Sequence, residues 1–366
     1  MISIYIHIPF CLKKCNYCGF VSVDNISDTN KNNYISALIK EIKLAAKTYN
    51  LTNKKINTIF FGGGTPSILE TNTLNKILIA VKNNFDASNL KEVSIEVNPA
   101  TNIDFSELKE IGFNRISIGV QSFNDTELKF LGRLHNSKLA ENTILNAQKE
   151  FKNISIDLIY GIPKQNKSMF EYSIDKAIEL GISHISAYSM SYEQGTKLYE
   201  MLMQKKIKTA TENTEFDMYI MLCNKLAANN IQQYEVSNFA KKRIECKHNK
   251  NYWKRTNYIG FGLAAHSLLN NIRWENTSNL DFYVKQLSKN ILPINNKEIL
   301  TKKQINEEQI FLGLRSKGIN QKILNAQQIQ FMEECIKMNF ATKKSNTFVL
   351  TNKGRFLTDY IVLKIL

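Results

Sequence analysis

Three cysteines near the N-terminus are the residues whose types and spacing could do chemistry. Cys11, Cys15 and Cys18 lie in the stretch YIHIPFCLKKCNYCGF, with three residues between the first two and two residues between the last two. Thiolates bind zinc and iron–sulfur clusters, and thiols also pair as disulfides. The spacing therefore raises the question of which of these three uses the chain makes of its thiols.

The rest of the sequence separates these alternatives. The chain has 6 Cys in 366 residues, and the other three are scattered at Cys223, Cys246 and Cys335. A disulfide framework is typical of an oxidising compartment, and no secretory signal precedes the first cysteine. A structural zinc site takes four protein ligands, usually from two pairs, and only one cluster is present. The pattern favours an iron–sulfur cluster with three thiolate ligands, which leaves one iron open for a small molecule.

Composition and charge place the chain among ordinary globular proteins. It is 43% hydrophobic and 22% charged, and its longest apolar stretch, Tyr258 to Leu269, is too short and too rich in glycine to span a bilayer. These features predict a cytoplasmic protein with reduced thiols. The formal net charge is +15, but most lysines are spread singly, so we interpret the charge as composition and predict no nucleic-acid partner.

Strand-like runs alternate with helix-length segments over roughly the first half of the chain. The runs are Ile2–Ile8, Ile56–Phe61, Val93–Asn98, Arg115–Gln121, Ile154–Tyr160 and His184–Met190. This alternation predicts parallel strands joined by crossover helices. Each run keeps one polar face, which must be sheltered, and a curved sheet with a polar, ligand-holding interior satisfies this need. We predict an α/β fold with a partial (β/α)6 TIM-like barrel.

The predicted domain division has three segments. Residues 1–236 form the partial barrel, residues 237–296 form an irregular connector, and residues 297–366 form a separate C-terminal domain. The last segment reads as helices, two short strands around Ser345 and Asn346, and a final helix. That order predicts a small, winged-helix-like α+β domain.

The cysteine spacing resembles the signature of the radical S-adenosylmethionine superfamily. The preceding YIHIPF and the aromatic Tyr17 narrow the resemblance to the oxygen-independent coproporphyrinogen III oxidase branch, which also contains the HemW-type haem chaperones. The resemblance implies a 4Fe–4S cluster on Cys11, Cys15 and Cys18. It also implies that the open iron is held by the amino and carboxylate groups of S-adenosyl-L-methionine, and that the barrel has six units.

The resemblance further implies a set of residues that contact S-adenosylmethionine. They are Tyr5, Tyr17, Gly63, Gly64, Thr65, Glu96, Gln121, Arg133 and Asp157. The glycines let a backbone approach a ligand closely, although a tight turn alone explains them equally well. A carboxylate such as Glu96 on the polar face of a strand needs a partner when buried. A structural ion pair remains the alternative for Arg133 and Asp157, and simple packing remains the alternative for the two tyrosines.

Three features favour the chaperone branch over the oxidases. Phe20 stands where the oxidases carry a fourth cysteine, and the ten residues before Cys11 are far shorter than the N-terminal extension of the oxidases. The segment HNKNYW, His248 to Trp253, matches the H-N-x-x-Y-W motif of the chaperone branch. The expected function is a chaperone that binds haem and delivers it to haem-accepting proteins. The alternative is a coproporphyrinogen III oxidase that decarboxylates two propionates through a 5′-deoxyadenosyl radical, so whether the chain is an enzyme stays open.

The HNKNYW motif lies in a basic stretch, Ala240 to Arg255, which holds seven basic residues against one acid. Haem needs an axial ligand, a flat apolar surface and cations for its propionates. We predict His248 as the haem ligand, with Cys246 as a second candidate. The alternative is a basic surface segment whose aromatic residues pack on the barrel, and peripheral contact with anionic lipid is another use of the same charge.

Overall fold

The computed structural model describes residues 1–366, which divide into two compact units. The first unit contains Met1–Leu158, Ser191–Lys208 and Asn257–Ile299. The second contains Ile159–Met190, Thr209–Thr256 and Leu300–Leu366. Each unit therefore joins segments that are distant in sequence, whereas the predicted domains were continuous segments of the chain. The change of unit after Ile299 lies close to the predicted start of the C-terminal domain at residue 297.

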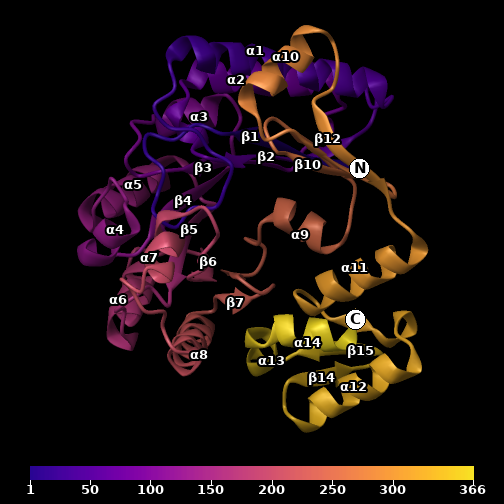
Figure 1. The fold of residues 1–366 in the computed structure, drawn as a ribbon. Helices are drawn as coiled ribbons and strands as arrows, with labels where there is room; N and C mark the ends of the chain where they lie inside the picture. The colour runs from indigo at the N-terminus through magenta and orange to yellow at the C-terminus, as the bar shows by residue number, and fades with distance from the viewer. The chain divides into compact units, whose positions relative to one another are not determined.

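The sheet of the first unit contains a run of parallel strands in chain order (Figure 1). They are β1 (Ile2–Ile8), β2 (Ile56–Gly63), β3 (Glu92–Val97), β4 (Arg115–Gln121) and β5 (Ile154–Tyr160), and their bounds agree with the predicted runs to within two residues. Ile4 and Ile6 are fully buried, and so are their polar neighbours Ser3 and His7 on the other face of β1. The polar face is therefore sheltered, as predicted, and no ring of strands is closed. These observations confirm the partial barrel.

Helices follow the strands, and α1 (Asp28–Thr48), α2 (Thr71–Asn84), α3 (Phe105–Glu110), α4 (Asp125–Leu131) and α5 (Ser137–Glu150) lie along the outer side of the curved sheet (Figure 1). The helical elements of this unit also include the 3-10 turn η1 (Pro66–Ile68) and, later in the chain, α7 (Lys197–Met203). Several begin at a side chain that accepts a backbone N–H of the first turn, for example Ser27 for α1 and Asn124 for α4. None of the helices combines the length and the apolar composition that a membrane span needs.

The segment Asn257–Ile299 corrects the predicted irregular connector. It forms β9 (Tyr258–Phe261), β10 (His266–Leu269), β11 (Ile272–Asn276), α10 (Leu280–Ser288) and β12 (Ile294–Ile299). β9 pairs with β1 in parallel, and β10 to β12 continue the sheet antiparallel. The prediction was wrong here because these strands are short and partly polar, so pairing with a neighbour decides their structure more than local pattern does.

A buried carboxylate ties α1 to this added segment. Glu41 accepts hydrogen bonds from Tyr283 Oη at 2.5 Å, Asn276 Nδ2 at 2.6 Å and the Gly262 N–H at 2.8 Å. Burial raises the pKa of Glu41 to about 7, and the three donors lower it. A buried carboxylate is tolerated where such donors satisfy it. Through these contacts α1 holds the strands β9, β10 and β11 and the helix α10 on the barrel.

The second unit combines the last barrel elements with the C-terminal domain. Its elements before residue 300 are α6 (Lys167–Glu179), β6 (His184–Ser189), α8 (Glu212–Ala228), β7 (Gln232–Gln233), β8 (Asn238–Ala240) and α9 (Lys247–Trp253). α9 is a second correction, because the predicted irregular connector also forms a helix here. β8 pairs antiparallel with both β6 and β7.

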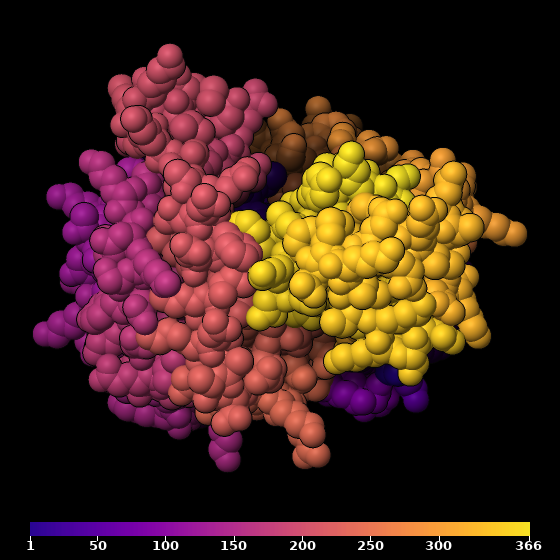
Figure 2. Space-filling model, turned by 90° about the horizontal axis from the view of Figure 1, so that it is seen from below, coloured from indigo at the N-terminus to yellow at the C-terminus, as the bar shows by residue number.

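The C-terminal domain has the predicted α+β order. Its elements are α11 (Lys302–Leu314), β13 (Ile319–Asn320), η2 (Gln321–Ile323), α12 (Ala326–Lys337), β14 (Ala341–Lys344), β15 (Thr347–Leu350), α13 (Asn352–Phe356) and α14 (Thr358–Ile365). The three strands form an antiparallel sheet in the order β13-β15-β14 beside a hydrophobic core that includes Ile310, Met332 and Phe348. In Figure 2 the orange-to-yellow C-terminal residues form one continuous mass. The winged-helix-like domain is confirmed.

Candidate functional site

The three predicted cluster cysteines lie on the loop that follows β1. Cys11, Cys15 and Cys18 are free thiols and partly exposed. Backbone hydrogen bonds hold the loop, from the Cys11 N–H to Val23 O at 3.0 Å and from the Cys18 N–H to Cys15 O at 3.2 Å. Desolvation is the main cause that raises the pKa of Cys11 and of Cys18. The thiols therefore need a cation or donors nearby before they ionise.

Two side chains from other elements donate to the sulfurs. Thr65 Oγ1 lies 3.6 Å from Cys11 Sγ, and Arg133 Nη1 lies 3.4 Å from Cys15 Sγ. Such contacts favour the thiolate, which is the form that binds metal. The chain has no group of three His, Cys, Asp or Glu side chains gathered as ligands of one ion. A four-iron cluster takes each thiolate at a different iron, so three free thiols on one loop with donors at the sulfurs fit that group.

The glycine turn after β2 is packed against the cysteine loop. Gly63 has φ +110°, and a Cβ atom there would lie 2.5 Å from the ring of His7. A Cβ on Gly64 would lie 2.8 Å from Phe10 O, and the Thr65 N–H donates to the same oxygen at 2.8 Å. The N–H groups of Gly64 and Thr65 thus hold this turn against the end of β1 and the segment that follows it. The groups of the turn that can accept hydrogen bonds from a ligand are its carbonyl oxygens and the Thr65 hydroxyl.

Two carboxylates lie at the polar face beside this turn. Glu96, near the end of β3, accepts the Gly63 N–H at 3.1 Å. Burial, and then the negative charge of Asp157 on β5, raise the pKa of Glu96 to about 8. Gly62 leaves room for the carboxylate, since a Cβ there would lie 3.1 Å from both of its oxygens. A pair of carboxylates in a desolvated site is suited to a cationic ligand.

Arg133 and Gln121 complete the predicted set in the first unit. Arg133 donates to Gly119 O at 2.6 Å, and its Nε atom is buried without a hydrogen-bond partner. Gln121 ends β4 with φ +72°, where the pairing register with β5 shifts. Irregularities of this kind at a strand end re-aim a side chain and occur often near active sites. Burial raises the pKa of Tyr17 well above its usual range, and Arg133 opposes that shift.

The structure therefore brings the predicted residues of the first unit together at the carboxyl ends of β1 to β5. Tyr5 is stacked on Phe60 and also forms a 3.2 Å hydrogen bond with His7 Nδ1. His7, which contacts Tyr5 and lies against Gly63, was not predicted as a site residue. Its position on the polar face of β1 could have indicated it. Asn16, in the same loop as the cysteines, has a structural role, because its amide donates to Phe130 O at 2.8 Å.

The predicted haem ligand belongs to the second unit. His248 is 1% exposed on α9, and its Nε2 atom lies 2.9 Å from Tyr252 Oη. Burial lowers the pKa of His248 to about 3, so its imidazole is neutral at physiological pH. The second candidate, Cys246, is buried and caps α9 by accepting the Asn249 N–H at 3.5 Å. Neither side chain is presented to solvent.

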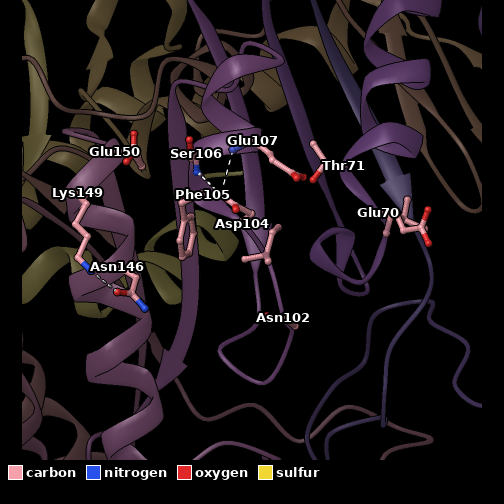
Figure 3. A pocket seen from close by; sticks show the side chains of 12 residues that line it. Glu70, Thr71, Asn102, Asp104, Phe105, Ser106, Glu107, Asn146, Lys149 and Glu150 are labelled. Atoms are coloured by element: carbon pink, nitrogen blue, oxygen red, sulfur yellow. Dashed lines mark hydrogen bonds between the residues drawn. The ribbon is translucent and has the colours of Figure 1, made fainter.

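A groove of about 560 Å³ on the first unit contains none of the predicted site residues (Figure 3). Its walls come from the start of α3, the end of α5 and the loops that precede α2 and α3. The most central carboxylate in the view, Asp104, accepts the N–H groups of Ser106 and Glu107 and so caps α3. This groove therefore has a structural explanation and receives no functional assignment.

The sequence profile of the Radical SAM superfamily matches residues 5–177. The heme chaperone HemW of Bacillus subtilis is 37% identical over 332 residues, which cover 88% of this chain and 86% of the relative. HemW of Lactococcus lactis is 36% identical, with 86% of this chain and 82% of the relative covered. The chain belongs to the HemW family. A Mycobacterium tuberculosis HemW, 30% identical, covers 100% of this chain and 94% of its own length.

The HemW fold is also that of a solved relative. The structure of the Escherichia coli coproporphyrinogen III oxidase HemN superposes with a TM-score of 0.84, covers 100% of this chain and 89% of the other, and is 22% identical. At that identity the likeness concerns the fold alone. Membership of the HemW family within the Radical SAM superfamily implies a 4Fe–4S cluster and S-adenosylmethionine. It also favours the iron–sulfur interpretation over the zinc and disulfide alternatives.

Proposed function

We propose that this protein is a haem chaperone that binds a 4Fe–4S cluster, S-adenosylmethionine and haem, and delivers haem to haem-accepting proteins. The observation that carries the proposal is the identity of 37% to a heme chaperone HemW over 88% of the chain. The gathering of nine predicted contact residues around the cysteine loop supports the same conclusion. We place this activity in the cytoplasm, where thiols stay reduced.

Cys11, Cys15 and Cys18 are the proposed cluster ligands. When bound, the cluster supplies an electron-transfer centre with one open iron that binds S-adenosylmethionine. The hydroxyl of Thr65 and the guanidinium of Arg133, which already donate to two of the sulfurs, stabilise the thiolate forms. Without the Thr65 hydroxyl, the pKa of the buried Cys11 thiol would be raised further.

Glu96 and Asp157 are proposed to orient S-adenosylmethionine by charge. The methionyl ammonium and the sulfonium are cations, and a cation beside Glu96 would offset the burial and the Asp157 charge that raise its pKa. The turn at Gly63, Gly64 and Thr65 offers acceptors to the ammonium. Gln121 and Arg133 offer donors to the carboxylate and ribose oxygens, while Tyr5 and Tyr17 offer flat surfaces to the adenine and sulfonium ends.

His248 is the proposed axial ligand of haem. A neutral imidazole can bind iron directly, and burial keeps the pKa of His248 at about 3. The side chain of His248 is 1% exposed, so ligation requires α9 to expose it, and ligation through Nε2 also requires its hydrogen bond with Tyr252 to break. The proposal therefore includes a rearrangement of α9 on haem binding.

The experiment that tests the proposal is anaerobic reconstitution of the cluster followed by haem titration and transfer. We expect the protein to bind haem and to activate a haem-free recipient enzyme faster than free haem at the same concentration. Failure to bind haem at micromolar concentrations would contradict the proposal. The alternative, coproporphyrinogen III oxidase, would be supported by protoporphyrinogen formation in the same preparation.

A further inference from the structure

A cleft in the second unit lies between α9 and α11 and has a volume of about 270 Å³. Its lining is mainly cationic and aromatic. Lys250, Lys254, Arg255 and Lys317 are the cations, Trp253 and Tyr234 are the aromatic residues, and Glu245 is the one acid; the other lining residues are uncharged. None of the residues proposed for the cluster and S-adenosylmethionine lines this cleft.

The positive charge of the cleft exceeds what the protein itself neutralises. Lys250 pairs with Glu245 at 3.6 Å, and Arg255 Nε pairs with Glu308 at 2.6 Å. Lys254 and Lys317 form no ion pair. Arg255 also has a buried Nη2 atom without a hydrogen-bond partner, on a side chain that is 11% exposed. A buried guanidinium nitrogen without an acceptor costs free energy, so the cleft is suited to an anionic ligand.

The aromatic residues restrict what kind of anion fits. Trp253 and Tyr234 line the same cleft as Leu312. The Tyr234 hydroxyl is held by His184 Nε2 at 2.9 Å and by the Cys246 N–H at 3.3 Å, so its ring has a fixed position. Inorganic phosphate would use the cations and leave these surfaces unused. A flat apolar ligand that carries carboxylates would use both.

The position of His248 separates this cleft from the proposed axial ligand. Successive residues of an α-helix are turned by about 100°, so Lys250, Trp253 and Lys254 share one side of α9 and His248 lies on roughly the opposite side. In agreement, His248 is buried against Tyr252 while those three side chains line the cleft. A ligand in the cleft therefore does not touch His248 in this conformation.

We propose that the cleft between α9 and α11 binds the carboxylate-bearing edge of haem. The volume suits an edge with two propionates rather than a whole macrocycle, since pockets for ligands of that size are generally larger. Lys250, Lys254, Arg255 and Lys317 meet the propionates, and Trp253 and Tyr234 contact the ring. The proposal rests on the haem-chaperone function above and adds the surface on α9 that holds haem independently of its axial ligand.

The test uses the full-length protein with its cluster reconstituted, and metal-free protoporphyrin IX as the probe. The chain has two tryptophans, so comparison of the wild type with Trp253→Phe isolates the quenching of Trp253 fluorescence. We expect Lys250→Gln/Lys254→Gln to lower the affinity about tenfold. The matched control is Lys43→Gln/Lys47→Gln, which removes two charges at the same spacing from the exposed side of α1 and should leave the affinity unchanged.

The dimethyl ester of protoporphyrin IX identifies the propionates as the partners of the lysines. We expect the ester to bind the wild type about tenfold more weakly than the acid, and the double lysine variant to show no further loss. Equal affinities of the variant and the α1 control, or of the ester and the acid, would overturn the cleft proposal while haem binding itself stands. The cleft proposal would also be overturned if the wild type bound haem without quenching the fluorescence of Trp253. A wild type that binds no porphyrin at all would instead contradict the haem-chaperone function.

Discussion

Single residues decide whether the cysteine loop can hold a cofactor. Burial raises the pKa of the Cys11 and Cys18 thiols, and Thr65 and Arg133 reach the sulfurs of Cys11 and Cys15 from outside the loop. Glu96 needs a cation. Its carboxyl group is buried beside Asp157, and both effects raise its pKa and favour the neutral form when no cation is bound. The chemistry proposed for this site therefore depends on groups that are unfavourable in isolation and are compensated by a ligand.

Cys15→Ala should remove most of the iron from anaerobically reconstituted protein, since two remaining thiolates hold a four-iron cluster poorly. Iron and sulfide analysis, together with the brown colour, measures the effect. Cys335→Ala is the matched control, because Cys335 lies buried in the core of the C-terminal domain and should leave the iron content unchanged. Full retention of iron and sulfide in Cys15→Ala would rule out the ligand assignment.

Glu96→Gln should stabilise the cofactor-free protein at alkaline pH. The pKa of Glu96 is raised from 4.5 to about 8 in the folded chain. Between these values the folded state binds a proton that the unfolded state has lost, so stability from this group is present at low pH and is lost as the pH rises toward 8. Because Gln cannot ionise, we expect a gain of about 1–3 kcal/mol in the free energy of unfolding near pH 9 and little change near pH 4.

Urea unfolding of the cofactor-free protein at the two pH values measures this effect. Glu110→Gln on the exposed face of α3 is the control and should change stability little at either pH. The same Glu96→Gln change should weaken S-adenosylmethionine binding, because the charge that attracts the cation is gone. If the variant is no more stable than the wild type near pH 9, the burial argument for Glu96 is wrong.

His248→Ala should weaken haem binding and shift the Soret band while leaving the iron–sulfur content intact. Tyr252→Phe is the informative partner variant, since it removes the 2.9 Å hydrogen bond and retains the imidazole. If His248 must leave Tyr252 to reach the iron, Tyr252→Phe should bind haem at least as tightly as the wild type. Unchanged haem affinity and spectrum in His248→Ala would return His248 to a structural role.

Loops and strand ends are the elements that assemble the site. The turn after β2 approaches the loop after β1 so closely that its glycines have no room for a side chain. The end of β4 is bent at Gln121, and α4 ends at Gly132, which lets the following Arg133 turn back toward Cys15. The site thus depends on the ends of parallel strands meeting at one edge of the sheet.

Gly63→Ala should destabilise the protein by about 2–4 kcal/mol and abolish cofactor binding, because it adds both backbone strain and a clash. Gly63 has φ +110°, and a Cβ there would lie 2.5 Å from the ring of His7. Gly181→Ala is the matched control, with φ +71° and nothing within 4 Å of the added Cβ. Gly181→Ala should lower the free energy of unfolding only by the backbone strain, about 1 kcal/mol. Equal thermal stability of the two variants would contradict the packing argument.

At the scale of the whole molecule, two compact units carry separate parts of the proposed function. The first contains the cysteine loop and the contact residues, and the second contains α9, His248 and the basic cleft. Each unit is built from three stretches of the chain, so the two functions are not divided at a single point in the sequence. Substitutions among the cofactor residues of the first unit should leave haem binding largely intact. Substitutions in α9 or the basic cleft should leave binding of the cluster and of S-adenosylmethionine largely intact.

The reconstituted protein should show no measurable decarboxylation of coproporphyrinogen III. Phe20, which stands in the place of the fourth cysteine of the oxidases, is 68% exposed, so this position offers neither a thiol nor a closed wall. Exclusion of water from a radical intermediate is one task of a closed active site. Anaerobic turnover with a chemical reductant, assayed for protoporphyrinogen, tests this, with the E. coli oxidase as the positive control. Robust product formation would favour the enzyme over the chaperone.

The sequence alone was enough to predict the strands of the barrel, the three grouped cysteines and the residues that the structure gathers around them. These features are local, because ligand spacing, strand alternation and glycine turns depend on residues close together in the chain. Only the tertiary structure decided that β9 to β12 extend the sheet beyond β1 and that Glu41 anchors them, since both depend on partners more than 200 residues away. It also decided that His248 and the lysines of one basic stretch face opposite sides of α9, which follows from helix geometry and from the packing of α9 against α11.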